Sequence, residues 1–142
     1  MKNLLKNKTF WFLVFSVAGI GVGYWLGYSY ESGLCYADFE SNTFDVSCHQ
    51  LYNKIGGSLF YSMQAIALVF LVLLFVPHAF NAWKKFAIWF LPLMFIYFAI
   101  YENQGFFSVP EESVYRFLSV VYAALSLAII GWKMLQKQRT IS

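Results

Sequence analysis

Two cysteines and a histidine carry the most reactive side chains in this sequence. Cys35 and Cys48 are the only cysteines, twelve residues separate them, and His49 directly follows the second. A thiol beside a basic group can act in disulfide exchange, because the base lowers the pKa of the thiol. The same thiols can instead form a structural disulfide, which for a loop of this length stabilises a fold by roughly 3 kcal/mol. The residues therefore allow either a redox site or a structural bridge.

The spacing of the cysteines favours the structural bridge. In outline the chain resembles four-helix membrane redox enzymes, such as the vitamin K epoxide reductases and the bacterial quinone-linked disulfide-forming proteins, which use a Cys-x-x-Cys pair and further cysteines. This sequence has neither the close pair nor a second pair. We predict a Cys35–Cys48 disulfide in an oxidising compartment, with two free buried thiols as the alternative, and no catalytic residue. His49 is expected to be a solvated loop histidine.

The composition indicates what kind of fold holds these residues. Hydrophobic residues make up 60% of the chain and charged residues only 12%, whereas a soluble domain has roughly a quarter of its residues charged. A hydrocarbon core about 30 Å thick is crossed by roughly 20 helical residues. We therefore predict an all-α membrane protein whose four transmembrane helices form a four-helix bundle. Residues 1–142 are expected to form one domain, with spans at about 9–30, 55–77, 84–101 and 114–134 and an outer loop at 31–54.

The first span has one competing interpretation. Lysines precede an apolar stretch that contains small residues, as in a secretory signal peptide. The stretch from Thr9 to Tyr30 contains no charge, and it is longer than the roughly 7–15 apolar residues of a signal peptide. An uncleaved first helix is therefore expected.

Charged residues sort by the predicted side of the membrane. The two tails and the link between the second and third spans contain eight bases and no acid, a net charge of +8. The other connections contain seven acids and two bases, a net charge of −5, and the two sides add to the formal charge of +3. Short loops rich in Lys and Arg remain in the cytoplasm. We therefore predict cytoplasmic termini, an external loop 31–54, and a bacterial inner (plasma) membrane as the location.

Small residues spaced four apart mark a contact face in the first span. Gly19, Gly23 and Gly27 form a pattern typical of a glycine zipper, and in lipid such residues allow close contact between helix backbones. Packing within the chain is expected, and an oligomer seam or a passive pore is the alternative. The candidate partner faces are Ser58, Ser62 and Ala65 in the second span and Ser119, Ala123, Ala124 and Ala128 in the fourth.

The remaining polar signals are few. Gln64 is the most polar residue at mid-depth, and with Tyr61 and Tyr97 it is a candidate for a small polar pocket. Ser47 with Gln50 and Ser108 with Glu111 have the spacing of capping boxes, which predicts helix starts nearby. Between the two membrane interfaces the spans contain no Asp, Glu, Lys, Arg or His, which disfavours active transport. No metal-ligand cluster or cofactor motif is visible in the sequence.

These observations favour a non-enzymatic function. The first hypothesis is an accessory, assembly or interaction protein that docks a protein partner, or a second copy, through its outer loop or helix grooves. The alternative is a quinone- or lipid-linked membrane redox enzyme that uses Cys35, Cys48 and His49. The expected surroundings are the lipid bilayer. Nucleic acid is not expected as a partner, because the basic residues follow the membrane topology.

Overall fold

The structure is a computed structural model that describes residues 8–38, 43–101 and 109–139. Four of its helices are long and apolar enough to cross a membrane, which confirms the predicted set of four apolar helices. The elements in chain order are α2 (Lys8–Gly27), β1 (Ala37–Asp38), β2 (Thr43–Phe44), α3 (Val46–Phe75), the 3-10 turn η1 (Pro77–Ala79), α4 (Phe80–Ile100) and α5 (Glu111–Arg139). Ser108, which belongs to a predicted capping box, lies outside the described residues.

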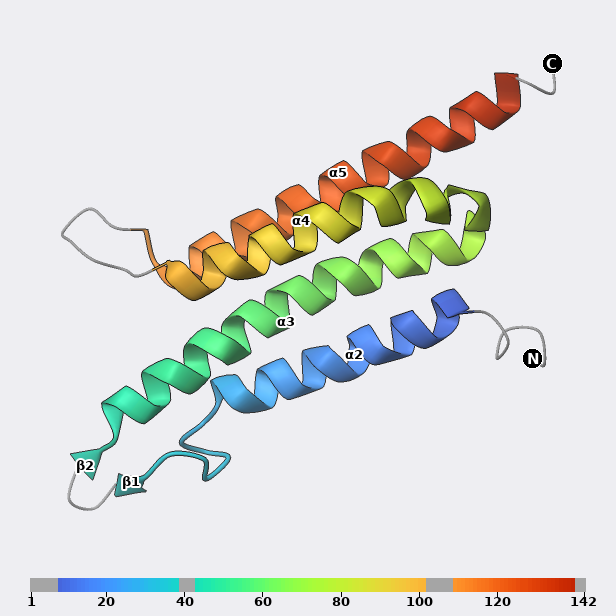
Figure 1. Ribbon diagram of the computed structural model, residues 1–142. Helices are drawn as coiled ribbons and strands as arrows, with labels where there is room; N and C mark the ends of the chain where they lie inside the picture. Colours follow the sequence, from blue (N-terminus) through green and yellow to red (C-terminus); the bar gives the residue numbers. More distant parts are fainter. Residues whose placement is uncertain (1–7, 39–42, 102–108, 140–142) are drawn as a thin grey trace.

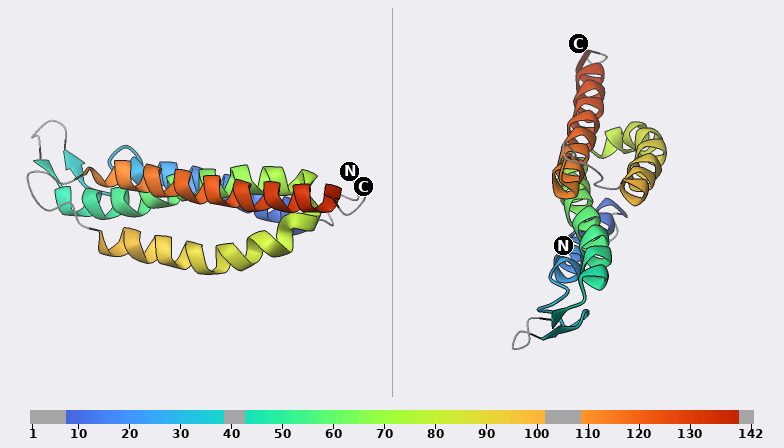
Figure 2. Two further views of the ribbon diagram at one scale, coloured as in Figure 1. Left: turned by 90° about the horizontal axis from the view of Figure 1, so that it is seen from above. Right: turned by 90° about the vertical axis from the view of Figure 1, so that its left-hand side faces the viewer.

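Successive helices run in opposite directions in an open arrangement (Figure 1). Seen from the end that holds the β-hairpin, α2, α3 and α5 lie in a row and α4 lies to one side (Figure 2). Among the described elements, α2 contacts only α3, α3 also contacts α5, and α4 packs mainly against α5. A closed four-helix bundle is therefore not confirmed. We call the end with β1, β2 and the start of α3 the hairpin end.

Prolines determine how α3 and α4 are joined. Pro77 disfavours helical backbone at the residue before it, and Val76 accordingly has φ −126° and ψ 61° and ends α3. A 3-10 turn begins at Pro77 and leads into α4. Pro92 lies inside α4, where it leaves the carbonyl of Ile88 without its helical amide donor. The path of α4 is curved in the left view of Figure 2.

The main core lies between α3, α4 and α5. Phe70 of α3 contacts Trp83 of α4 with ring centroids 5.0 Å apart, and Phe98 of α4 contacts Tyr115 of α5 at 4.9 Å. The largest fully buried hydrophobic side chains are Tyr122, Leu73, Ile130 and Val69. The ring of Tyr115 also lies beside Gly57 of α3, so the first turns of α5 pack against the N-terminal half of α3.

Helix α2 is attached to α3 through small residues. A Cβ atom on Gly23 would lie 2.6 Å from the backbone nitrogen of Phe60, and one on Gly56 would lie 2.5 Å from that of Gly27. The glycine face of α2 therefore meets Gly56, Phe60 and, at Gly19, the side chain of Met63. The contact lies on α3, which is the second predicted span, and the α3 residues nearest to the glycines are Gly56, Phe60 and Met63. The opposite side of α2 is exposed and apolar, with side chains such as Phe15 and Trp25.

Charged residues gather at the two ends of the molecule. The described acids lie at the hairpin end: Glu31, Asp38, Asp45, Glu111 and Glu112. The opposite end, where α2 begins and α5 ends, holds the bases Lys8, Lys84, Lys85, Lys133, Lys137 and Arg139. The separation predicted along the sequence is therefore a separation in space.

Candidate functional site at the hairpin end

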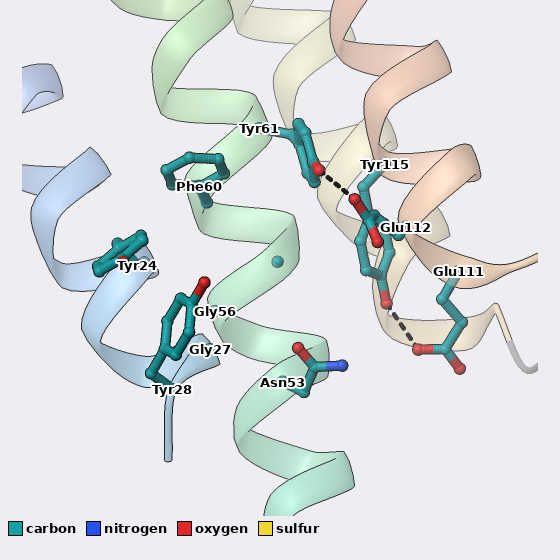
Figure 3. A pocket seen from close by; sticks show the side chains of 12 residues that line it. Tyr24, Gly27, Tyr28, Asn53, Gly56, Phe60, Tyr61, Glu111, Glu112 and Tyr115 are labelled. Atoms are coloured by element: carbon teal, nitrogen blue, oxygen red, sulfur yellow. Dashed lines mark hydrogen bonds between the residues drawn. The ribbon is translucent and has the colours of Figure 1, made fainter. Parts of the chain in front are cut away.

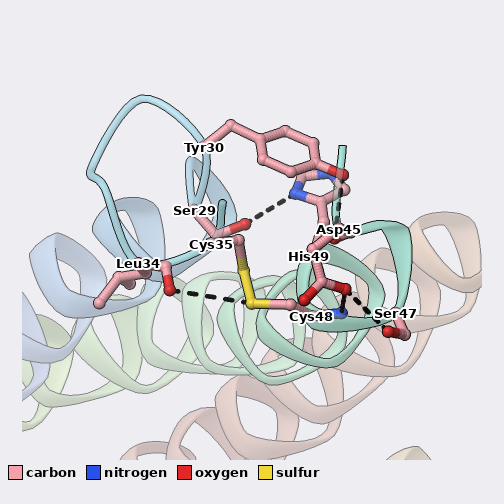
Figure 4. Close-up of a disulfide and its surroundings, with 8 residues drawn as sticks. All are labelled: Ser29, Tyr30, Leu34, Cys35, Asp45, Ser47, Cys48 and His49. Carbon is pink, nitrogen blue, oxygen red and sulfur yellow. Dashed lines mark hydrogen bonds between the residues drawn. A yellow bond between two sulfur atoms is a disulfide. The ribbon is translucent and has the colours of Figure 1, made fainter. Parts of the chain in front are cut away.

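The short hairpin is joined to α3 by a disulfide. Strands β1 and β2 pair antiparallel, with Ala37 opposite Phe44. Cys35 precedes β1 and is bonded to Cys48 in the first turn of α3, with the two Cα atoms 5.8 Å apart (Figure 4). This confirms the predicted bridge. Because Cys48 belongs to α3, the disulfide fixes the hairpin on the end of this long helix. The side chain of Cys35 is buried.

His49 packs against the chain segment that precedes the hairpin. Its ring stacks on Tyr30, with centroids 4.2 Å apart and planes 12° apart. Its Nδ1 lies 2.7 Å from the hydroxyl oxygen of Ser29, which is fully buried. The prediction of a solvated loop histidine is wrong, because the residue lies in α3 and both its ring face and Nδ1 are engaged (Figure 4). The contacts of the imidazole are with Ser29 and Tyr30, so they do not place it as a base for the cysteines.

Asp45 starts α3. Its carboxylate accepts hydrogen bonds from the backbone N–H of Cys48 at 3.0 Å and from the hydroxyl of Ser47 at 2.8 Å. These hydrogen bonds hold the pKa of Asp45 below its ordinary value of 3.8, and the bond from the Cys48 amide has the largest effect. The capping box predicted from Ser47 and Gln50 is wrong, since Asp45 is the N-cap and α3 begins at Val46. An aspartate cap keeps a negative charge at the positive end of the helix.

We call residues 28–38 and 43–54 the head. Further contacts tie its parts together: the hydroxyl of Tyr30 donates to the carbonyl of Asp45 at 3.2 Å, and the amide of Asp45 donates to the carbonyl of Tyr36 at 3.1 Å. Large apolar side chains nevertheless remain on its surface. The exposed fractions are 66% for Tyr36, 55% for Val46 and 58% for Leu51. The head is therefore cross-linked internally and exposes several large apolar side chains.

A trough crosses α3 beside the head (Figure 3). Its volume is about 350 Å³. One wall comes from the end of α2, the floor comes from α3, and the other wall comes from the first turns of α5. The residues that line it are Gly23, Tyr24, Gly27, Tyr28, Asn53, Gly56, Gly57, Phe60, Tyr61, Glu111, Glu112 and Tyr115.

Two carboxylates of the trough bind tyrosine hydroxyls. Tyr115 donates to Oε2 of Glu111 at 3.1 Å, and Tyr61 donates to Oε1 of Glu112. On the opposite wall, the rings of Tyr24 and Tyr28 lie with centroids 4.5 Å apart. The titratable groups that line the trough are therefore four tyrosines and two acids.

The predicted polar pocket is only partly assembled. Tyr61 and Gln64 line one shallow groove of about 230 Å³ between α3 and α5, together with Arg116 and Ser119. Tyr97 is not among its lining residues and stacks on Tyr101 with centroids 5.7 Å apart. The structure thus brings two of the three residues together and places Tyr97 elsewhere.

The trough was not predicted from the sequence. Two spacings could have indicated parts of it, since Tyr24 and Tyr28, and likewise Glu111 and Tyr115, are four residues apart and therefore adjacent on a helix face. Nothing in the sequence predicts that these two pairs face each other across α3. Within residues 8–38, 43–101 and 109–139, no three acids, histidines or cysteines lie close enough together to hold a metal ion.

No protein-family model, no curated protein and no solved structure matches the chain. The head, the trough and the distribution of charge are therefore the features that bear on its function.

Proposed function

We propose that this chain is a non-enzymatic, multi-pass membrane protein whose head lies outside the cytoplasm and docks onto another protein. The separation of charge supports the orientation, because short segments rich in Lys and Arg stay on the cytoplasmic side. The opposite end carries such bases at the start of α4 and the end of α5. The membrane that fits this orientation and an oxidised cysteine pair is a bacterial inner (plasma) membrane.

The length of α3 supports a head that stands clear of the lipid. Its 30 residues correspond to about 45 Å at the usual rise per residue, against about 30 Å of hydrocarbon. The polar part of α3 is its beginning, where Ser47, His49, Gln50, Asn53 and Lys54 lie. The first turns of α3 therefore extend beyond the lipid and carry the hairpin with them.

The observation that carries the proposal is the apolar surface of this head. Exposed apolar side chains are ordinary on a surface that faces lipid, but beyond the lipid a group of them indicates an interaction site. Tyr36, Val46 and Leu51 are more than half exposed there. The disulfide and the Tyr30–His49 stack fix the backbone segments that carry these side chains before a partner binds, which lowers the entropic cost of association.

The charge of the head indicates the chemistry of the partner. Glu31, Asp38 and Asp45 belong to the head, and Lys54 is its one base among the described residues. A complementary partner presents an apolar patch bordered by Lys and Arg. We infer that this partner is an extracytoplasmic segment of another membrane protein. A second copy of this chain would meet the same acids and is therefore disfavoured.

Photo-crosslinking in native membranes tests the proposal. A photoreactive amino acid at Leu51 is expected to give one discrete protein adduct, and the matched position Phe75, which is 81% exposed at the other end of the same helix, is expected to give none. The change Tyr36→Glu should abolish the Leu51 adduct without lowering the unfolding midpoint. Equal adducts at both positions, or an adduct of twice the mass of the chain, would contradict docking onto a different protein.

A further inference from the structure

The trough is a second feature of the hairpin end, independent of the docking surface. Its walls are aromatic: Tyr24 and Tyr28 lie with ring centroids 4.5 Å apart, Tyr24 lies 6.3 Å from Phe60, and Phe60 lies 5.3 Å from Tyr61. These rings continue from the α2 wall across the floor to the α5 wall (Figure 3). Aromatic faces attract organic cations, because the ring carries negative charge above its plane.

The trough that these rings line also carries a net negative charge, which comes from two acids. Glu111 and Glu112 line it, and among the described lining residues none is basic. The hydrogen bonds described for the two carboxylates come from the hydroxyls of Tyr115 and Tyr61. Arg116, the nearest base on α5, lines the neighbouring groove with Gln64 instead. A cation in the trough would therefore be attracted by both carboxylates.

Glycines leave space for the ligand. Gly57 lies in the floor, where a Cβ atom would come within 3.3 Å of the Tyr115 ring. Gly27 lies at the other wall, where a Cβ atom would have only the Oδ1 of Asn53 near it, at 4.0 Å. The resulting volume of about 350 Å³ exceeds that of a methylated ammonium group, and it lies at the end of the helices that the proposed orientation places at the outer headgroup level.

We propose that this trough binds a substituted ammonium group, of the kind carried by a zwitterionic lipid headgroup or by a free organic amine. The aromatic rings contact the alkyl substituents, and Glu111 and Glu112 supply the counter-charge. Anionic ligands are disfavoured by the same two acids. The docking of the head does not depend on this site, and the site does not depend on the docking.

Calorimetric titration of the purified full chain in a maltoside detergent tests the binding chemistry. Choline chloride is expected to bind, and 3,3-dimethylbutanol, which has the same shape without the charge, is not. Glu112→Gln, and separately Tyr28→Leu, should weaken choline binding by about tenfold. The control Asp38→Asn changes an acid of the same end, in β1, that does not line the trough and should leave binding unchanged.

Two further experiments complete the test: a variant that fills part of the trough, and a measurement that distinguishes a lipid ligand from a free amine. Gly27→Ala should reduce binding by placing a methyl group in the trough, whereas Gly21→Ala, whose Cβ atom would have nothing within 4 Å, should not. Native mass spectrometry after reconstitution with phosphatidylcholine or phosphatidylglycerol distinguishes a lipid ligand from a free amine: retention of phosphatidylcholine alone assigns the lipid source, and choline binding without lipid retention assigns the free amine. Equal binding of choline and its neutral analogue, or unchanged binding in Glu112→Gln, would overturn the proposal.

Discussion

Gly56→Ala is expected to separate α2 from α3 and to lower the free energy of unfolding by roughly 1–3 kcal/mol, the usual cost of an overpacked contact. The added Cβ atom would lie 2.5 Å from the backbone nitrogen of Gly27 and 2.8 Å from the carbonyl oxygen of Gly23. Both are backbone atoms, so no side-chain rotation can relieve the contact. Because α2 contacts only α3 among the described elements, the whole helix must shift.

Gly21→Ala is the matched control for this change. It adds the same methyl group to α2 at a point where nothing lies within 4 Å, and alanine has a higher helix propensity than glycine. Its stability should be equal or slightly higher. Unfolding by sodium dodecyl sulfate in mixed micelles, followed by circular dichroism, measures both variants. Equal midpoints for the two would show that α2 is not held against α3 through this contact.

Replacing both cysteines, as Cys35→Ser with Cys48→Ser, is expected to lower stability by about 2–4 kcal/mol. The loss should be concentrated in the head, because the bridge joins the segment before β1 to the first turn of α3. Hydrogen exchange should therefore rise at the amide of Asp45, which is bonded to the carbonyl of Tyr36. The contact between Gly23 and Phe60 should be retained.

Reduction of the unmodified protein serves as the control for the cysteine replacement. Treatment with a phosphine reductant should reproduce the same loss of stability and the same exchange pattern. A redox enzyme would give the opposite result: the replaced chain would remain as stable as the original and would lose only electron transfer to a quinone. Unchanged stability and unchanged exchange in the head would therefore contradict a structural bridge.

The sequence predicted those features that depend on a single segment. Apolar intervals indicated the four helices, and two cysteines in one polar loop indicated the disulfide. The predicted span 55–77 ends close to the end of α3 at Phe75, where Pro77 constrains the residue before it. The start of α3 was less well determined, because Asp45 and Ser47 are both good capping residues and only the three-dimensional contact with Cys48 distinguishes them.

Features that depend on pairing between segments were not predicted. In lipid the packed and the lipid-facing sides of a helix are both apolar, so the sequence of α2 does not reveal that it contacts one helix alone. The trough likewise requires the start of α5 to lie beside the N-terminal half of α3, which brings Glu112 to Tyr61. His49 was misjudged for the same reason, since its partner Ser29 lies 20 residues away.

Labelling of the two cysteines in intact cells tests the central claim, that the hairpin end is an oxidised head outside the cytoplasm. Cys35 and Cys48 should react with a membrane-impermeant maleimide only after an impermeant reductant has been added, with no need to permeabilise the cells. Leu135→Cys, placed at the opposite end in a chain without the native cysteines, should react only after permeabilisation. If Cys35 and Cys48 instead reacted without reductant and only in permeabilised cells, the orientation, the bridge in its natural compartment and the docking surface would all be contradicted.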